Sequence, residues 1–114
     1  MTSLELATEV KKALDSKKAE DIKVLKVSEL TVIADYFVIA TGTSITQVKA
    51  LADEVEYRLE QQGVRPLHRQ GLETANWVAV DFGSVIVHIF YPQMREFYAL
   101  EKLWGDAEEI EIPD

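Results

Sequence analysis

The sequence predicts a single α/β domain in which a mixed sheet of roughly five strands is flanked by helices. Three observations support this fold class. Two alternating apolar runs meet at Gly83-Ser84, which indicates a tight β-hairpin, and the run at 35–42 is apolar on both faces, as in a central strand. Amphipathic helical stretches precede and follow that run. A chain of 114 residues is long enough for one hydrophobic core.

The composition excludes several classes of site. The chain has no cysteine, so disulfides, thiolate metal sites and cysteine nucleophiles are excluded. Its 12 basic and 20 acidic residues give a net charge of −8, which argues against direct binding to a nucleic-acid backbone. This charge fits either a basic partner or simple solubility. No apolar run nears the ~18 residues of a membrane span, and no targeting pattern is present, so we expect a soluble protein of a bacterial cytoplasm.

The N-terminal part predicts a helix and then a strand. Thr2 and Glu5 have the spacing of a capping box. Apolar residues then recur at helical spacing, at Leu6, Val10, Ala13 and Leu14. The stretch 21–27 follows as a strand, and Lys23 and Lys26 on its two faces favour an edge position.

A strand, a turn and a second helix follow a connection at 28–34. The strand at 35–42 is predicted to be central, and Ser44 and Gln47 have capping-box spacing at the start of the helix. The apolar stripe of this helix consists of Val48, Leu51, Ala52, Val55 and Leu59. Gly63 is predicted to end it.

The second half of the chain is predicted to add an edge strand, a hairpin and a helix. The stretch 64–69 returns to the sheet, where a proline restricts it to an edge or irregular strand, and 70–76 is a polar loop. A last helix begins at Pro92 and ends before Gly105. We therefore place the domain at 1–105 and an acidic tail at 106–114.

The hairpin at 77–90 has one wholly apolar face. If its turn is tight, the pairs across it are Phe82 with Val85, Val80 with Val87, and Val78 with Ile89. Because side chains alternate along a strand, these six share one face. We expect helices to cover this face.

The other face of the hairpin mixes aromatic and polar residues. Trp77 lies across from Phe90, and Asp81 and His88 are diagonal neighbours within reach of each other. His88 with Asp81 resembles part of a catalytic triad, but no nucleophile is placed beside the pair, and Ser84 lies in the turn. The alternatives are a histidine held by a neighbouring carboxylate and a contact to a partner.

Two other stretches invite a chemical interpretation. Gly42-Thr43-Ser44 lies where a strand turns into a helix, which suits a bound phosphate, but helix capping explains it better because no Walker lysine follows. Asp53, Glu54 and Glu56 resemble a carboxylate metal site but fall on the solvated face of a helix. We therefore predict no catalytic residue, no metal and no cofactor.

Three blocks of the sequence resemble the ribosomal silencing factor family, also called Iojap-like. The first is D-Y-F-V-I-A-T-G-T-S at 35–44 with Q-V-K-A-L-A-D-E-V-E at 47–56. The second is W-V-A-V-D-F-G-S-V-I-V-H-I-F at 77–90, and the third is R-E-F-Y-A-L-E-K-L-W at 95–104. The resemblance covers nearly the whole chain up to Trp104.

This resemblance implies a function that the residues alone do not reveal. Members of the family bind the large ribosomal subunit through its ribosomal protein fourteen, block joining of the small subunit and repress translation when nutrients are scarce. They are not known as enzymes, they are often dimers when isolated, and their fold is distantly similar to nucleotidyltransferases. The alternatives are a nucleotidyltransferase-like nucleotide-binding protein and a self-associating dimer with another partner.

The aromatic residues near the hairpin are the expected contact surface. They form either core under the last helix or a partly exposed patch with an acidic rim, which is typical of a protein interface. From the matching blocks and the face argument, we expect the partner contact to include Trp77, Asp81, His88, Phe90, Arg95, Tyr98, Glu101 and Trp104.

Overall fold

The computed structural model describes residues 1–93, 95 and 105–112 of the chain. Most of the predicted last helix therefore lies outside the described residues, together with Tyr98, Glu101 and Trp104 of the expected contact surface. The start of that helix is described, since Pro92 and Gln93 are helical and the Arg95 N–H donates to the Tyr91 carbonyl at 3.3 Å.

The described residues form a mixed α/β sheet structure, as the sequence predicts. The elements in chain order are α1 (Ser3–Ser16), β1 (Glu20–Lys26), β2 (Tyr36–Thr41), α2 (Ile45–Glu60), β3 (His68–Gln70), β4 (Trp77–Asp81), β5 (Val85–Phe90) and β6 (Glu108–Glu109). The strand order is β3-β4-β5-β2-β1-β6. Only β2 and β5 run parallel, and the other neighbours are antiparallel.

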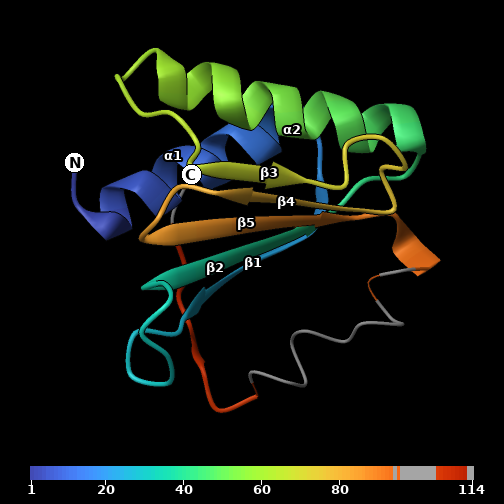
Figure 1. The fold of residues 1–114 in the computed structure, drawn as a ribbon. Helices are drawn as coiled ribbons and strands as arrows, with labels where there is room; N and C mark the ends of the chain where they lie inside the picture. Colours follow the sequence, from blue (N-terminus) through green and yellow to red (C-terminus); the bar gives the residue numbers. More distant parts are fainter. Residues whose placement is uncertain (94, 96–104, 113–114) are drawn as a thin grey trace.

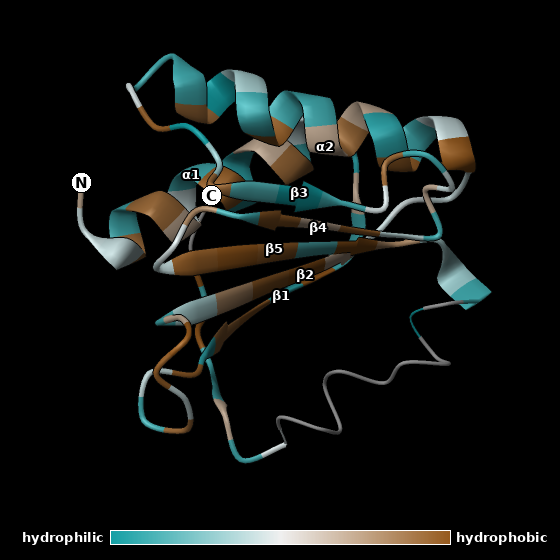
Figure 2. Ribbon diagram, viewed as in Figure 1, coloured by the Kyte–Doolittle hydropathy of each residue, from teal (hydrophilic) through white to brown (hydrophobic). Residues whose placement is uncertain are grey.

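Both helices cover the same face of the sheet (Figure 1). Their buried residues join one core cluster with the apolar face of the hairpin, including Val78, Val80, Val87 and Ile89, each fully buried. When the chain is coloured by hydropathy, the central strands β5, β2 and β1 are mostly brown, whereas the edge strand β3 and the outer side of α2 are largely teal (Figure 2). The prediction that helices cover the apolar hairpin face is therefore confirmed.

The helix ends use the residues that the sequence predicts. The Thr2 hydroxyl accepts from the Glu5 N–H at 3.1 Å and the Glu5 carboxylate accepts from the Thr2 N–H at 2.9 Å, which completes the capping box. At the end of α2, Gly63 adopts a φ of 78°, and its N–H donates to the Glu60 carbonyl at 2.9 Å. A left-handed glycine is the usual way to close a helix.

The register of the hairpin agrees with the predicted one throughout. Trp77 pairs with Phe90, Val78 with Ile89, Ala79 with His88, Val80 with Val87, and Asp81 with Ile86. The Phe82 N–H donates to the Val85 carbonyl at 2.9 Å, which closes the turn at Gly83-Ser84. The parallel pairing with β2 then places this hairpin in the middle of the sheet.

The sheet has six strands in the described residues, one more than predicted. The additional strand is β6, which lies in the acidic tail and pairs with Leu25 and Lys26 of β1. The Ile110 N–H continues this pairing by donating to the Val24 carbonyl at 2.8 Å, and Ile110 and Ile112 pack against the helix-side core. The sequence does not predict this strand, because glutamates are depleted in strands and a strand of two residues shows no periodicity.

We predict that Val87→Asp unfolds the domain. Val87 is fully buried between the sheet and the helices, where a carboxylate has no partner, so several kcal/mol of stability are lost, on the order of the whole stability of a small domain. Thermal melting followed by circular dichroism measures the effect. The control is Ser84→Asp, a change in the half-exposed turn that should melt like the wild type. Cooperative melting of Val87→Asp near the wild-type temperature would refute the face assignment.

Candidate functional site

The face of the sheet opposite α1 and α2 carries a second apolar cluster. Its buried members are Leu25, Val27, Ala34, Phe37, Ile39 and Phe90, and Trp77, Ile86 and Ala107 pack against them. No residue of α1 or α2 belongs to this cluster. The strand register brings it together, because Ile39 lies beside His88 and Thr41 beside Phe90 across the parallel pair. We call this the Trp77 face.

The Trp77 side chain is half-buried, and its indole ring is contacted by two neighbouring side chains. Its ring stacks on Phe90, with centroids 5.3 Å apart and planes inclined by 21°. Its indole N–H donates to Nδ1 of His88 at 3.1 Å. Stacking and the hydrogen bond fix the ring in one orientation while part of it stays exposed. A large aromatic side chain that is rigid before binding loses little conformational entropy when a partner covers it.

His88 supports Trp77 from within the sheet. Only 8% of its surface is exposed, and the Phe37 ring meets it edge-on at 5.1 Å. Because Nδ1 accepts the Trp77 hydrogen bond, the neutral ring carries its proton on Nε2. Within the described part of the chain, Nε2 is buried without a hydrogen-bond partner. Burial disfavours the charged ring and lowers the pKa of His88 to about 4.

Of the two interpretations of His88, the one in which the Asp81 carboxylate holds the histidine is wrong. Asp81 instead accepts the Gly83 N–H at 2.7 Å and thereby closes the hairpin turn. His88 has two diagonal neighbours on β4, Asp81 and Trp77, and the sequence pattern does not distinguish them. Because the Asp81 carboxylate is used in the hairpin turn, His88 pairs with the Trp77 indole. The structure therefore contains no acid–histidine pair at this position that could activate a nucleophile.

Arg95 is buried at the junction of the last helix with the sheet. It is 7% exposed, and Nη1 donates to the Asp21 carbonyl at 2.6 Å and to the Thr41 hydroxyl at 2.8 Å. Nη2 lies 3.3 Å from the Asp21 carboxylate. Asp21 has a φ of 49° at the irregularity of β1, which turns its carbonyl toward the arginine. Arg95 therefore ties the chain after β5 to β1 and β2.

The expected contact residues thus differ in what they can offer a partner. Trp77 and Asp81 have exposed surface. His88, Phe90 and Arg95 are buried, and Phe90 is completely so. The buried residues support the surface from below, since His88 and Phe90 both contact Trp77.

The Gly42-Thr43-Ser44 turn caps the start of α2, as the sequence pattern favours, and its polar groups are used for that purpose. The Ser44 hydroxyl accepts the Gln47 N–H at 3.0 Å, and the Gln47 side chain accepts from the Thr43 hydroxyl at 2.7 Å. A Cβ on Gly42 would lie 2.8 Å from the Val48 side chain, so the glycine allows α2 to approach the end of β2. The N–H groups of Thr43 and Gln47 and the hydroxyls of Thr43 and Ser44 are therefore engaged in capping the helix.

The carboxylates of α2 do not converge. Glu56 pairs with Arg69 of β3 at 3.1 Å, while burial raises the pKa of Glu56 against the effect of this arginine. Asp53 is exposed. Among residues 1–93, 95 and 105–112, no group of three His, Cys, Asp or Glu side chains could hold a metal ion.

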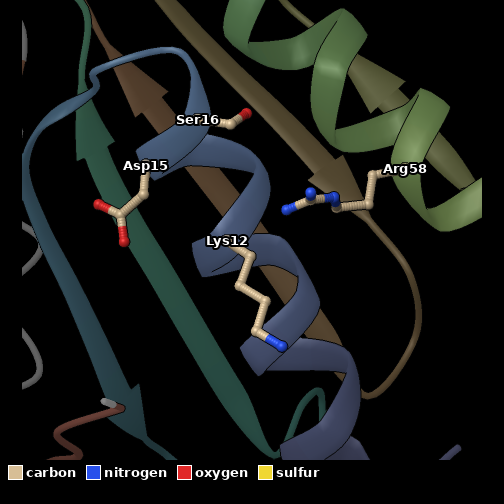
Figure 3. Close-up of a pocket in the computed structure, with 4 residues that line it drawn as sticks. All are labelled: Lys12, Asp15, Ser16 and Arg58. Carbon is tan, nitrogen blue, oxygen red and sulfur yellow. The ribbon is translucent and has the colours of Figure 1, made fainter. Parts of the chain in front are cut away.

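A shallow depression of about 580 Å³ lies between α1 and α2, lined by Lys12, Asp15, Ser16 and Arg58 (Figure 3). The Asp15 carboxylate pairs with Lys11 at 3.0 Å and points away from Arg58. The Ser16 hydroxyl donates to the Ala13 carbonyl at 2.7 Å. Because the Ser16 hydroxyl donates to the backbone and the Asp15 carboxylate pairs with Lys11, these two groups do not form a nucleophile–base pair. No helix in the described residues is long and apolar enough to cross a membrane.

The fold is that of an α/β protein, and its most distinctive surface feature is the Trp77 face, where a half-exposed aromatic ring is held by buried neighbours. Such a surface is typical of proteins that act by binding other proteins. Comparison with known proteins identifies the family of the chain. The model of the family described as "Ribosomal silencing factor during starvation" matches residues 1–114, and the chain belongs to this family. The name of the family places its members among the regulatory proteins of the ribosome.

Relatives and solved structures agree with this assignment. A ribosomal silencing factor of Halalkalibacterium halodurans is 41% identical over 98% of this chain and 96% of its own length. The chloroplastic Iojap protein of Arabidopsis thaliana is 36% identical over 97% of this chain and 46% of its own length. A crystal structure of a Chromobacterium violaceum protein superposes with a TM-score of 0.90 at 38% identity, over 100% of this chain and 92% of that one.

We predict that His88 makes folding stability pH-dependent. The unfolded chain takes up a proton at His88 near pH 6.5, whereas the folded chain takes it up only near pH 4. Between these values the unfolded state binds more protons, so stability falls as the pH falls, by on the order of 3 kcal/mol in total. Chemical denaturation of the wild type and of His88→Phe at several pH values measures the difference between their unfolding free energies.

The matched control for this prediction is the other histidine. His68 is exposed on the edge strand β3, so His68→Gln should keep the wild-type pH dependence. Parallel stability curves for the wild type and His88→Phe from pH 7 to pH 4 would contradict the assignment of a buried, neutral His88.

Proposed function

We propose that this chain is a translational repressor that binds the large ribosomal subunit through its ribosomal protein fourteen and sterically blocks joining of the small subunit. The observation that carries the proposal is the half-exposed Trp77, which is fixed by Phe90 and His88 on the sheet face that α1 and α2 leave free. Membership of the family supports the same function.

The charge of the chain favours a protein partner over RNA. With 12 basic and 20 acidic residues, the net charge of −8 repels a phosphate backbone and attracts a basic ribosomal protein. Asp81 brings a carboxylate to the end of the hairpin beside the Trp77 face. Complementary charge of this kind mainly accelerates encounter and selects the partner.

The proposed contact has a centre and a supporting layer. Trp77 and Asp81 touch the partner, while His88 and Phe90 hold Trp77 in place and Arg95 fixes the chain that follows β5. The sequence pattern adds three residues from the last helix to this proposal, namely Tyr98, Glu101 and Trp104.

The proposed mechanism requires no catalysis. A protein that occupies a surface needed by the small subunit blocks joining by its volume alone. We therefore propose a cytoplasmic regulator without enzymatic activity or cofactor, active when nutrients are scarce. When free, the chain pairs with a second copy, and this dimer competes with the ribosome if both use the Trp77 face.

Co-sedimentation with purified ribosomal subunits tests the proposal. Wild-type chain should sediment with large subunits and lower the fraction of joined ribosomes when small subunits are added. Trp77→Ala should weaken binding by about 2 kcal/mol, or roughly thirty-fold, because the variant lacks the indole ring at the centre of the proposed contact.

The control for this experiment separates binding from folding. Tyr57→Ala removes an aromatic residue that is 61% exposed on α2, on the other side of the sheet, and should bind like the wild type. Circular dichroism verifies that both variants fold. Full affinity in a folded Trp77→Ala variant would remove Trp77 from the contact, and a wild-type chain that binds without reducing subunit joining would refute the steric mechanism.

A further inference from the structure

The exposed apolar side chains of the chain are concentrated at one end of the sheet. The described residues include eight large apolar side chains that are exposed, and six of them belong to segments that meet at the hairpin end of the sheet. These six, which we call the hairpin-end patch, are Met1, Leu4, Leu30, Val32, Ile33 and Leu67. Exposed apolar side chains that gather on one part of a surface are typical of interaction sites.

Contacts between the segments place the six residues at the same end. The Ser3 hydroxyl, between Met1 and Leu4, donates to the Asp35 carboxylate at 2.6 Å. The Asp35 N–H in turn donates to the Ser84 carbonyl of the hairpin turn at 2.7 Å. Leu67 lies on the other side of this turn, where its N–H donates to the Asp81 carbonyl at 2.7 Å. The patch therefore follows the end of the sheet from the first helix to the edge strand.

The most exposed part of the patch is the loop that joins β1 to β2. Val32 is 103% exposed and Ile33 is 59% exposed. The loop, cyan in Figure 1, extends beyond the ends of its strands and is largely brown when coloured by hydropathy in Figure 2. Val32 buries none of its side chain in this chain, and Leu30 and Ile33 bury only part of theirs, so the loop tip contributes little to folding for its apolar content.

The loop is nevertheless built as a defined structure. Its base is closed by the Val27 N–H, which donates to the Asp35 carbonyl at 2.8 Å, and by the buried side chains of Val27 and Ala34. Within it, the N–H groups of Leu30 and Thr31 both donate to the Val27 carbonyl, at 2.9 and 3.0 Å. The Thr31 hydroxyl accepts the Ile33 N–H at 3.2 Å. The apolar tip is therefore presented in a fixed shape, which lowers the entropic cost of binding.

The charges around the patch indicate the chemistry of its partner. Glu5 and Glu29 are exposed there, and Asp35 and Asp81 are half-exposed. Positive charge at this end comes from Lys26, Arg65 and the N-terminal ammonium of Met1, and Arg65 lies 3.7 Å from Glu60. Apolar side chains within an acidic rim fit a basic protein that offers an apolar groove.

We infer that the hairpin-end patch is a second contact surface for the basic ribosomal protein to which the Trp77 face binds, with the tip of the β1–β2 loop inserted into an apolar groove of that protein. This inference rests on the proposed function. Asp81 connects the two surfaces, because it belongs to the same strand as Trp77 and its backbone carbonyl holds Leu67. A contact of two surfaces explains how a small chain stays on the ribosome and why its loop exposes apolar residues.

A double substitution at the loop tip, Val32→Ser with Ile33→Ser, tests the inference in the full-length chain. Binding to purified ribosomal protein fourteen and to large subunits is measured by titration for this variant, the wild type and Trp77→Ala. We expect the loop variant to bind at least tenfold more weakly while its melting temperature stays unchanged, because both side chains are exposed. The matched control is Tyr57→Ser, which removes from α2 a large side chain that is about as exposed as Ile33 and should keep wild-type affinity.

The outcomes separate this inference from the proposed function. Weaker binding of both the loop variant and Trp77→Ala supports both surfaces. Full affinity of the loop variant, with weak binding of Trp77→Ala, overturns the second surface and leaves the proposed function intact. A wild-type chain that binds neither target overturns the proposed function and, with it, the partner assigned to the patch. If sedimentation shows that the loop variant loses a dimer but keeps its ribosomal affinity, the patch serves a second copy of the chain and the inference is wrong.

Discussion

The register of the hairpin formed by β4 and β5 is the constraint on which the rest of the structure depends. Because side chains alternate along a strand, this register sends Val78, Val80, Val87 and Ile89 toward the helices and Trp77, His88 and Phe90 toward the other side. A shift by one residue would exchange the two faces and place a tryptophan and a histidine in the helix-side core. The same register that builds the core therefore builds the surface that we assign to the partner.

The Trp77 face shows how a binding surface is stabilised before its partner arrives. The indole N–H would be available to water or to a partner, but it is used by His88. The ring of His88 is kept neutral by burial, which lowers its pKa to about 4, so the acceptor nitrogen is maintained through the physiological range. What remains for a partner is the exposed part of a flat aromatic ring with acidic surroundings, a surface suited to recognition.

Most of the fold could be predicted from the sequence, and the failures have physical causes. Periodicity and capping residues identify α1 and α2, and the Gly-Ser turn sets the hairpin register. The strand β6 could not be found, because Glu108 and Glu109 have low strand propensity and depend on the free edge of β1. The pairing of His88 with Trp77 could not be predicted from the sequence pattern either, because Asp81 lies on the equivalent diagonal. Asp81 does not contact His88 because its carboxylate accepts the Gly83 N–H instead. The apolar loop tip carried a signal in Leu30, Val32 and Ile33 that a search for periodicity does not detect.

The central claim is that Trp77 becomes covered when the chain binds the large subunit, and the fluorescence of Trp77 tests it most directly. The chain has two tryptophans, so Trp104→Phe, which keeps an aromatic ring at that proposed contact position, leaves Trp77 as the single reporter. Titration with purified ribosomal protein fourteen should shift the emission to shorter wavelength and reduce quenching by acrylamide, because water and quencher are excluded from the ring. Saturable binding with an unchanged emission and unchanged quenching of Trp77 would contradict the account.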